Sequence, residues 1–456
     1  MIKKLIKRVF GGKKDVDSKS LKPKVLKVAD HGIKREMISA CALRTTDALQ
    51  QAGYQALVVG GAVRDLLTGR APKDFDVATD ATPDQVRAVI RRSRIIGRRF
   101  QIVHALCGQE TVEVSTFRAM SVPIAEPDNE NNEMRADEHG RLLRDNVWGT
   151  QAEDASRRDF TANALFYDPN TEEVWDYHHG VADIRAKKLR MIGDPATRYR
   201  EDPVRMLRAA RFAAKLGFSI DAPTKAPIKD MADLLANVPR SRLFDEMMKL
   251  LLSGHAWAGV TTLRSEGLHH GLLPMLDVIL EQPMGERFVK LALEQTDIRI
   301  QQDKSVSPGF LFATLLWHEV LAAWGTREKG GMRKMQALHE AVDDVLRQQS
   351  AQLNIPRRYD AVMNEIWQVQ PRFLDRSGVR PFRLLSHPRF RAGFDFLLLR
   401  CASGELDAEL GAWWEKFQSV DEAEQQAMLL TETTPTKKRR RRSKRKPAES
   451  SPADLL

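Results

Sequence analysis

The sequence has 456 residues, a net charge of +11 and an ordinary hydrophobic content, and its length predicts roughly two to four domains. The 3 cysteines, Cys41, Cys107 and Cys401, lack paired spacing, which argues against a disulfide framework or a zinc site and indicates a reducing, cytoplasmic compartment. The best candidate for a membrane span, 309–324, is interrupted by polar residues. We therefore expect a buried helix there, no integral membrane segment and no signal peptide.

Positive charge is concentrated in two end segments. Residues 1–35 and 437–446 each carry a net charge of +9, whereas residues 36–436 sum to −5. This distribution is typical of a chain tethered to a polyanion such as RNA by counterion release, although solubilising tails would show the same pattern. The tail residues predicted to bind RNA are Lys437, Lys438, Arg439, Arg440, Arg441, Arg442, Lys444, Arg445 and Lys446.

Residues 1–35 are predicted to form a basic N-terminal arm, flexible from residue 11 onward because it contains Gly11, Gly12 and Pro23. Residues 2–10 place apolar side chains at helical spacing between lysines and an arginine, which predicts a short basic amphipathic helix. Such a helix can contact a membrane surface or a protein partner, for example an RNA-degradation protein. Alternatively, it serves only solubility.

Residues 36–166 alternate short apolar runs with helical stretches, which predicts a small α+β domain with a mixed sheet. The strand at 56–59 is ended by two glycines. Thr82 and Pro83 are typical of the N-cap and the first residue of a helix. The other elements predicted here are a helix at 62–68, strands at 75–77, 102–106 and 111–117, and a mobile polar loop at 120–145.

The rest of the chain is predicted to be helical, with regions at 167–255 and 256–430 followed by a disordered basic tail at 431–456. A helix that opens at Asp202-Pro203 is expected to end at Gly217. Further helices are predicted at 228–254, 257–281 and 286–297 and between 308 and 430.

A diglycine turn provides the strongest local indication of chemistry. Gly60 and Gly61 separate a strand from a helix start, so the backbone can approach a ligand and unpaired N–H groups can meet a phosphate. Arg64, one helical turn further on, can add a charged fork to the same phosphate.

Two acidic side chains follow at close spacing. Asp74 and Asp76 lie two residues apart on a predicted strand, so both carboxylates project from one face while Phe75 points into the core. Two such carboxylates can share a pair of Mg²⁺ ions, one activating a hydroxyl and one neutralising a departing pyrophosphate. A solvated acidic strand would have the same pattern.

Glu113 occupies the polar face of the otherwise apolar strand 111–117. It is either a third carboxylate near the metals or a solvated strand residue. Arg157, Arg158 and Asp159 supply charge for a triphosphate and a carboxylate for a metal or a ribose hydroxyl. As an isolated motif, they would more often form a surface ion-pair cluster that caps a helix.

Taken together, Gly-Gly-x-x-Arg-Asp at 60–65 and Lys-Asp-Phe-Asp at 73–76 resemble the nucleotidyltransferase superfamily of polymerase beta type. Arg-Arg-Asp-Phe-Thr at 157–161, Asn-Ala-Leu at 163–165 and Glu-Asp-Pro-Val-Arg-Met-Leu-Arg at 201–208 are similar to its class II branch, which contains bacterial poly(A) polymerases and tRNA CCA-adding enzymes. The resemblance implies an α+β nucleotidyltransferase head at 36–166, followed by an all-α neck and body.

The resemblance also implies roles for individual residues. Arg158 would bind the nucleotide and Asp159 would serve the active centre. Asp202 and Arg205, three apart on one helix face, would pair with the base edge as a protein template, with Arg208 near the phosphates.

The segment 95–104 is similar to the poly(A) polymerase side of this branch, and the basic tail suits a substrate without defined shape. We therefore expect template-independent addition of AMP from ATP to RNA 3′ ends, with two Mg²⁺ ions. A CCA-adding enzyme and a catalytically inactive RNA-binding adaptor are the alternatives.

Overall fold

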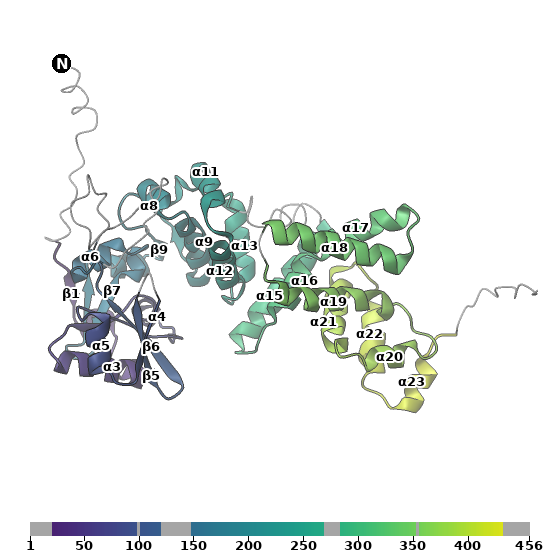
Figure 1. Ribbon diagram of the computed structural model, residues 1–456, viewed down its shortest axis with the longest axis horizontal. Helices are drawn as coiled ribbons and strands as arrows, with labels where there is room; N and C mark the ends of the chain where they lie inside the picture. Colours follow the sequence, from purple (N-terminus) through teal and green to yellow (C-terminus); the bar gives the residue numbers. More distant parts are fainter. Residues whose placement is uncertain (1–20, 98–100, 120–146, 269–282, 353–354, 432–456) are drawn as a thin grey trace, which may run out of the picture. The chain divides into compact units, whose positions relative to one another are not determined.

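The computed structural model describes residues 21–97, 101–119, 147–268, 283–352 and 355–431 (Figure 1). The chain divides into two compact units, Met1–Val362 and Met363–Leu456. Within the described residues, no helix is both long and apolar enough to cross a membrane. The predicted amphipathic segment 2–10, the loop 120–145 and the basic tail 437–446 lie outside the described residues.

One mixed sheet forms the base of the site. Its strand order is β1-β8-β7-β2-β3-β6-β5-β4, and the neighbouring pairs are antiparallel except β3 and β6, which are parallel. The eight strands are β1 (Lys24–Leu26), β2 (Ala56–Val59), β3 (Asp76–Thr79), β4 (Ser93–Ile96), β5 (Ile102–Cys107), β6 (Glu110–Thr116), β7 (Leu165–Asp168) and β8 (Glu173–Asp176). The sheet and the helices that follow confirm the predicted α+β head and helical remainder.

Local sequence explains the centre of this sheet. All four residues of β2 are buried, as expected for an apolar central strand. Gly60 then adopts φ 74° and ψ −122°, and α4 (Gly61–Leu67) begins directly after it. α5 (Pro83–Val89) starts as predicted, because Thr82 and Gln85 form a capping box.

Helices pack on the sheet and bury its apolar side chains. α3 (Ala40–Gln51) and α5 pack against the strands β3 to β6. A buried cluster on the sheet includes Val59, Ala78, Phe117 and Phe166, together with Ala155 from α6 (Gln151–Arg157). This packing fixes the strand ends from which the site residues project.

Two predicted boundaries of the head were wrong. Residues 24–26, expected within a flexible arm, form the edge strand β1, which pairs with β8 and buries Leu26. The sheet also continues past residue 166, because β7 pairs with β2 and β8 pairs with β7. Sheet pairing between distant segments, which local periodicity does not reveal, decided both boundaries.

The cysteine prediction was also wrong, since Cys41 on α3 and Cys107 at the end of β5 form a disulfide with Sγ atoms 2.07 Å apart. The two residues are 66 positions apart in the sequence, so no short spacing motif marks them. α3 packs against β5, which brings the pair together. Cys401 is a free thiol.

After β8 the first unit is helical, apart from a two-stranded sheet of β9 (Lys188–Leu189) and β10 (Ser219–Ile220). α9 (Val204–Leu216) ends at Gly217 in the left-handed region, as predicted. Figure 1 shows α9 beside α12 (Arg240–Leu251) and α13 (Ala256–Ser265), with which it packs.

The remaining described helices of the first unit lie both before and after β8. They are α2 (Val28–His31), η2 (Arg35–Met37), η3 (Thr161–Asn163), α7 (Gly180–Arg185), α8 (Pro195–Glu201), α10 (Ala222–Lys225), α11 (Ile228–Met231), η4 (Ala232–Asn237), α15 (Pro283–Gln301), α16 (Pro308–Leu315), α17 (Trp317–Lys329), α18 (Lys334–Gln352) and η5 (Arg357–Tyr359).

The second unit has its own apolar core, which contains the buried side chains of Phe373, Leu397, Trp414 and Phe417. Trp414 also donates a hydrogen bond from Nε1 to the Phe373 carbonyl oxygen at 2.8 Å. The helices beyond residue 359 are α19 (Asp360–Phe373), α20 (Arg380–Leu385), α21 (Phe390–Ser403), α22 (Ala408–Phe417) and α23 (Glu422–Met428).

Candidate active site

A pocket of about 420 Å³ opens beside the diglycine turn, a volume within the usual range for small-molecule sites. The sheet, α9 and α12 all contribute to its lining. The lining residues are Gly60, Gly61, Arg64, Asp76, Arg158, Asp159, Asn163, Asp202, Arg205, Arg208, Phe212, Arg242 and Glu246. The structure thus brings every predicted nucleotide-binding residue into one pocket, together with Asp76 and Asp159.

The diglycine turn requires glycine at its first position. Gly60 has φ 74°, a conformation that L side chains rarely adopt. A Cβ atom there would lie 3.2 Å from Nη1 of Arg158. The turn therefore lets the Arg158 guanidinium lie directly against the backbone at the start of α4.

Replacing Gly60 by Ala is expected to destabilise the first unit by about 1–3 kcal/mol, because the new side chain is strained in this conformation. It should also displace Arg158 and raise the KM for a nucleoside triphosphate. Thermal unfolding and nucleotide titration measure the two effects. Gly69→Ala is the control for strain alone, since Gly69 has φ 71° but a Cβ atom at that position would meet nothing within 4 Å. Equal nucleotide affinity in both variants would contradict the contact with Arg158.

The acidic residues meet where β3 and β6 lie side by side. Asp76, the first residue of β3, is paired in register with Glu113 on β6, and Asp74 precedes β3 by two residues. Phe75 is buried, as predicted. Desolvation and the nearby Glu113 raise the pKa of Asp76 to about 6; Arg158 opposes this shift and Asp74 adds to it. Carboxylates crowded in this way repel one another unless a cation lies between them.

The donor set suits a hard divalent cation, because Mg²⁺ prefers carboxylate oxygens and keeps several of its waters. In the described part of the chain, no group of three or more His, Cys, Asp or Glu side chains is arranged to hold a metal ion by itself. Asp76 lines the pocket, whereas Asp74 and Glu113 do not. A cation here would therefore be shared with substrate oxygens, as Mg²⁺ commonly is in phosphoryl-transfer sites.

Two predicted phosphate ligands are held by neighbouring side chains. Arg64 is buried and donates from Nη1 to Asn163 Oδ1 at 2.6 Å and from Nε to Asp65 Oδ1 at 2.8 Å. Arg158 donates from Nη2 to Asp154 Oδ2 at 2.9 Å. Both guanidinium groups are thus oriented before any ligand arrives, which lowers the entropic cost of binding a phosphate.

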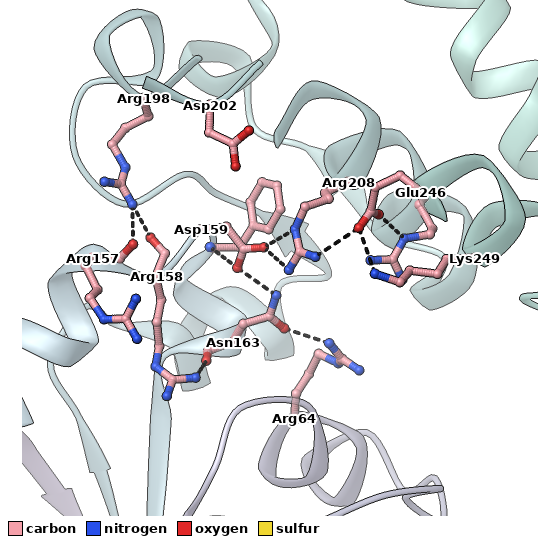
Figure 2. Close-up of polar contacts among 12 residues, drawn as sticks. Arg64, Arg157, Arg158, Asp159, Asn163, Arg198, Asp202, Arg208, Glu246 and Lys249 are labelled. Atoms are coloured by element: carbon pink, nitrogen blue, oxygen red, sulfur yellow. Dashed lines mark hydrogen bonds and ion pairs between the residues drawn. The ribbon is translucent and has the colours of Figure 1, made fainter. Parts of the chain in front are cut away.

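Asp159 lies at the centre of the polar network drawn in Figure 2. Its Oδ2 accepts from Arg208 Nη2 at 2.6 Å and Nε at 2.8 Å, and its Oδ1 accepts from Asn163 Nδ2 at 3.0 Å and the Phe160 amide at 2.8 Å. Burial opposes ionisation, but Arg208, Asn163 and the Phe160 amide lower the pKa of Asp159 to about 2. Both oxygens are engaged within the protein, so Asp159 orients Arg208, and its role with the metals stays a prediction.

Asp202 and Arg205, the two residues predicted to recognise the base, use their side chains to bond to other residues. Asp202 accepts from the Val204 amide at the start of α9 at 3.3 Å and from Arg242 Nη2 at 2.6 Å. Arg205 donates from Nη1 to Glu201 Oε2 at 2.9 Å and to the Arg198 carbonyl oxygen at 2.8 Å. Both side chains line the pocket, with further polar atoms left to meet a base edge.

Sequence reasoning missed four lining residues, which are Asn163, Phe212, Arg242 and Glu246. Asn163 belongs to the Asn-Ala-Leu motif, and its side chain connects Arg64 to Asp159. Glu246 is buried and lies 3.6 Å from Nη1 of Arg208. Arg242 and Glu246 come from α12, where no local motif marks them, and only the packing of α12 on α9 brings them to the pocket.

The fold, and a pocket that combines a glycine turn with acidic side chains and arginines, define a nucleotidyltransferase. Three protein-family models match the chain, one after another along the sequence. They are the poly A polymerase head domain at 56–190, a probable RNA and SrmB-binding site of polymerase A at 217–280, and the polymerase A arginine-rich C-terminus at 330–447.

Curated relatives agree with this assignment. The poly(A) polymerase I of Haemophilus influenzae is 42% identical over 92% of this chain and 93% of its own length, and that of Escherichia coli O6:H1 is 43% identical over 88% and 86%. A CCA-adding enzyme of Bacillus pumilus is 37% identical over only 51% of this chain and 54% of its own. The chain belongs to the bacterial poly(A) polymerase family.

Solved structures show the same fold. The Bacillus stearothermophilus CCA-adding enzyme in complex with CTP matches with a TM-score of 0.55 and 26% identity, over 82% of this chain and 80% of that one. A tRNA nucleotidyltransferase with a primer tRNA and an incoming ATP analogue matches with a TM-score of 0.56 and 20% identity, over 82% of this chain and 98% of that one.

Proposed function

We propose that this enzyme adds AMP from ATP to RNA 3′ ends without a template and releases pyrophosphate. The observation that carries the proposal is a single pocket in which Asp76 meets the diglycine turn, the arginines of α4 and α9, and Arg158, which directly follows α6. The extent of the match to the poly(A) polymerase I relatives supports ATP and RNA as substrates over CTP and tRNA.

The chain's own residues bind and orient the triphosphate. Arg64 and Arg158 are held by acidic neighbours on either side of the turn, where phosphate oxygens can accept from them. Gly60 and Gly61 at the start of α4 line the same pocket, so a phosphate can approach the backbone there. The RNA 3′-oxygen forms a bond to the α-phosphorus of ATP, the bond from that phosphorus to the bridging oxygen of pyrophosphate breaks, and the hydroxyl proton passes to solvent.

Asp74, Asp76 and Glu113 would hold two Mg²⁺ ions, which supply Lewis-acid activation of the hydroxyl and charge neutralisation of the pyrophosphate. The in-register pairing of Asp76 with Glu113 supports Glu113 as the third carboxylate. Positioning and electrostatics account for most of the acceleration in phosphoryl transfer. Preoriented side chains around the pocket fit that requirement.

We propose that Asp202 and Arg205 recognise the adenine edge, as a carboxylate acceptor and a guanidinium donor on neighbouring faces of the α8–α9 corner. The ion pair between Asp202 and Arg242 supports this assignment, because it fixes the carboxylate that faces the base. In a pocket without a nucleic-acid template, fixed side chains must decide which base fits.

We further propose a division into the head, neck and helical body, with the basic tail holding RNA. Both substrates are abundant in the cytoplasm, where the activity would operate. The amphipathic segment at 2–10 would serve association with a membrane surface or with RNA-degradation proteins.

One incubation tests the proposal. The purified protein is mixed with a labelled single-stranded RNA, Mg²⁺ and ATP, and the products are separated by length. We expect long adenosine tails with ATP and little extension with CTP. Addition of a complete CCA end to a tRNA that lacks it would favour the CCA-adding alternative, and no extension of any RNA would favour an inactive adaptor.

A further inference from the structure

Four polar side chains form a row across the sheet that begins at the active site. Asp76 on β3 is paired in register with Glu113 on β6, Glu113 with His104 on β5, and His104 with Arg94 on β4. Residues directly opposite one another on neighbouring strands project from the same face. The row therefore extends the face of the carboxylates towards the edge strand of the sheet.

From β6 to β4 this face is open, although α6 covers its continuation at Val59 and Ala78, and the opposite face is covered. Val77, Val103 and Val114, each next to a member of the row, are at most 1% exposed, and α3 and α5 pack against these strands. Glu113 and His104 keep 55% and 26% of their side-chain surface exposed, and Arg94 is exposed. Among the described residues, the outer strands β4 and β5 thus present a solvent-facing surface next to the carboxylates.

Along the row, the side chains on the open face change from acidic to basic. His104 Nε2 lies 3.5 Å from Glu113 Oε1, so the imidazole contacts the outermost carboxylate. Arg94 follows at the edge, with Arg91 and Arg92 exposed just before β4. Ile96, two residues after Arg94 on the same face, is 43% exposed and adds an apolar surface. Single-stranded nucleic acid sites use positively charged side chains to follow the phosphate backbone, and the three arginines supply that charge here.

We propose that this open face, formed by Glu113, His104, Arg94 and Ile96, seats the 3′-terminal segment of the RNA primer. The inference rests on the proposed function, because the primer's 3′-hydroxyl must reach Asp76 and Glu113 to be extended. Arg94 lies two strand spacings, about 10 Å, from Glu113, a distance that the terminal nucleotide and its phosphate can span. Arg94 binds that phosphate, Ile96 packs against a ribose or base, and His104 holds the Glu113 carboxylate in position.

Binding of RNA without ATP or Mg²⁺ tests the surface separately from catalysis. A fluorescent oligoadenylate is titrated with the full-length protein at several salt concentrations. Arg94→Ala should weaken binding about fivefold to tenfold and lower the slope of log affinity against log salt by about 0.7, the value for one phosphate contact on a single strand. In extension assays the KM for RNA should rise by a similar factor, with the KM for ATP unchanged.

Two further variants complete the experiment. Arg87→Ala removes an equal charge from α5 on the covered side of the sheet and should leave affinity and salt slope unchanged. Ile96→Glu places a negative charge beside Arg94 and should weaken RNA binding further. Equal salt slopes for Arg94→Ala and Arg87→Ala would overturn the proposal, as would a change in oligomeric state in Ile96→Glu, which would assign the face to a second copy of the chain. RNA binding that shows the expected differences in salt slope, without any extension by the unmodified protein, would instead refute only the proposed function.

Discussion

Replacing Asp76 by Asn is expected to reduce AMP incorporation by about a thousandfold or more, since metal catalysis contributes several kcal/mol to such reactions. Asp76 is the acidic residue that both lines the pocket and is paired in register with Glu113. Single-turnover extension of a labelled RNA measures the loss. Asp74→Asn should behave in the same way, and full activity in either variant would contradict the metal assignment.

The same substitution is expected to stabilise the metal-free protein. The folded-state pKa of Asp76 is raised from 3.8 to about 6, so the charged carboxylate destabilises the folded state above that pH. The penalty disappears as the pH falls below the unfolded pKa, because both states are then protonated. Asp76 is partly open to solvent, which reduces the effect to about 1 kcal/mol.

Thermal unfolding in the presence of a chelator checks this prediction. Asp76→Asn should unfold about 2 °C above the unmodified protein near neutral pH, and the difference should shrink as the pH falls below about 6 and vanish below 3.8. Asp84→Asn is a suitable control, since Asp84 is an exposed carboxylate on α5, remote from the carboxylate row. An unfolding temperature that is unchanged or lowered at neutral pH would show that the carboxylates are not crowded.

The second large effect is expected at the ion pair between Asp159 and Arg208. Asp159→Asn should lower the free energy of unfolding of the first unit by about 3 kcal/mol, because it leaves the Arg208 charge partly buried without its main partner. Since the pKa of Asp159 is lowered to about 2, its stabilising contribution is fully present above 3.8 and is lost only as the pH falls towards 2. The difference in stability should therefore be constant across neutral pH.

A double-mutant cycle with Arg208→Gln separates positioning from metal binding. If Asp159 acts through Arg208, the two substitutions should be strongly non-additive in both stability and kcat, and affinity for Mg²⁺ should be unchanged. Glu294→Gln, in an exposed ion pair with Lys290 on α15, is the control and should change stability by less than about 0.5 kcal/mol. A large loss of Mg²⁺ affinity in Asp159→Asn would instead support direct metal ligation.

Features with a local cause were predictable from the sequence. The turn at Gly60, the cap at Thr82 and the end of α9 at Gly217 each depend on one residue's conformational freedom or one side-chain hydrogen bond. The presence of both Asp202 and Arg205 in the pocket was also predictable, because residues three apart at a helix start lie close together.

Features that depend on contacts between distant segments were not predictable. The edge strand β1 is defined by its pairing with β8, and the disulfide of Cys41 depends on the packing of α3 against β5. The two oxygens of Asp159 accept hydrogen bonds from residues as close in the sequence as Phe160 and as distant as Arg208. The sequence motif identified Asp159 as a site residue, but it could not show that both of its carboxylate oxygens accept hydrogen bonds from other residues of the protein.

The parallel pairing of β3 with β6 has a consequence for synthesis of the chain. Asp76 and Glu113 become neighbours only after α5 and the intervening hairpin β4–β5 have been made, and the pocket also requires Glu246 from α12. Because domains form as they leave the ribosome, a nascent chain shorter than about half of the protein has no complete site. Nucleotide transfer is therefore expected only from chains that have been synthesised beyond α12.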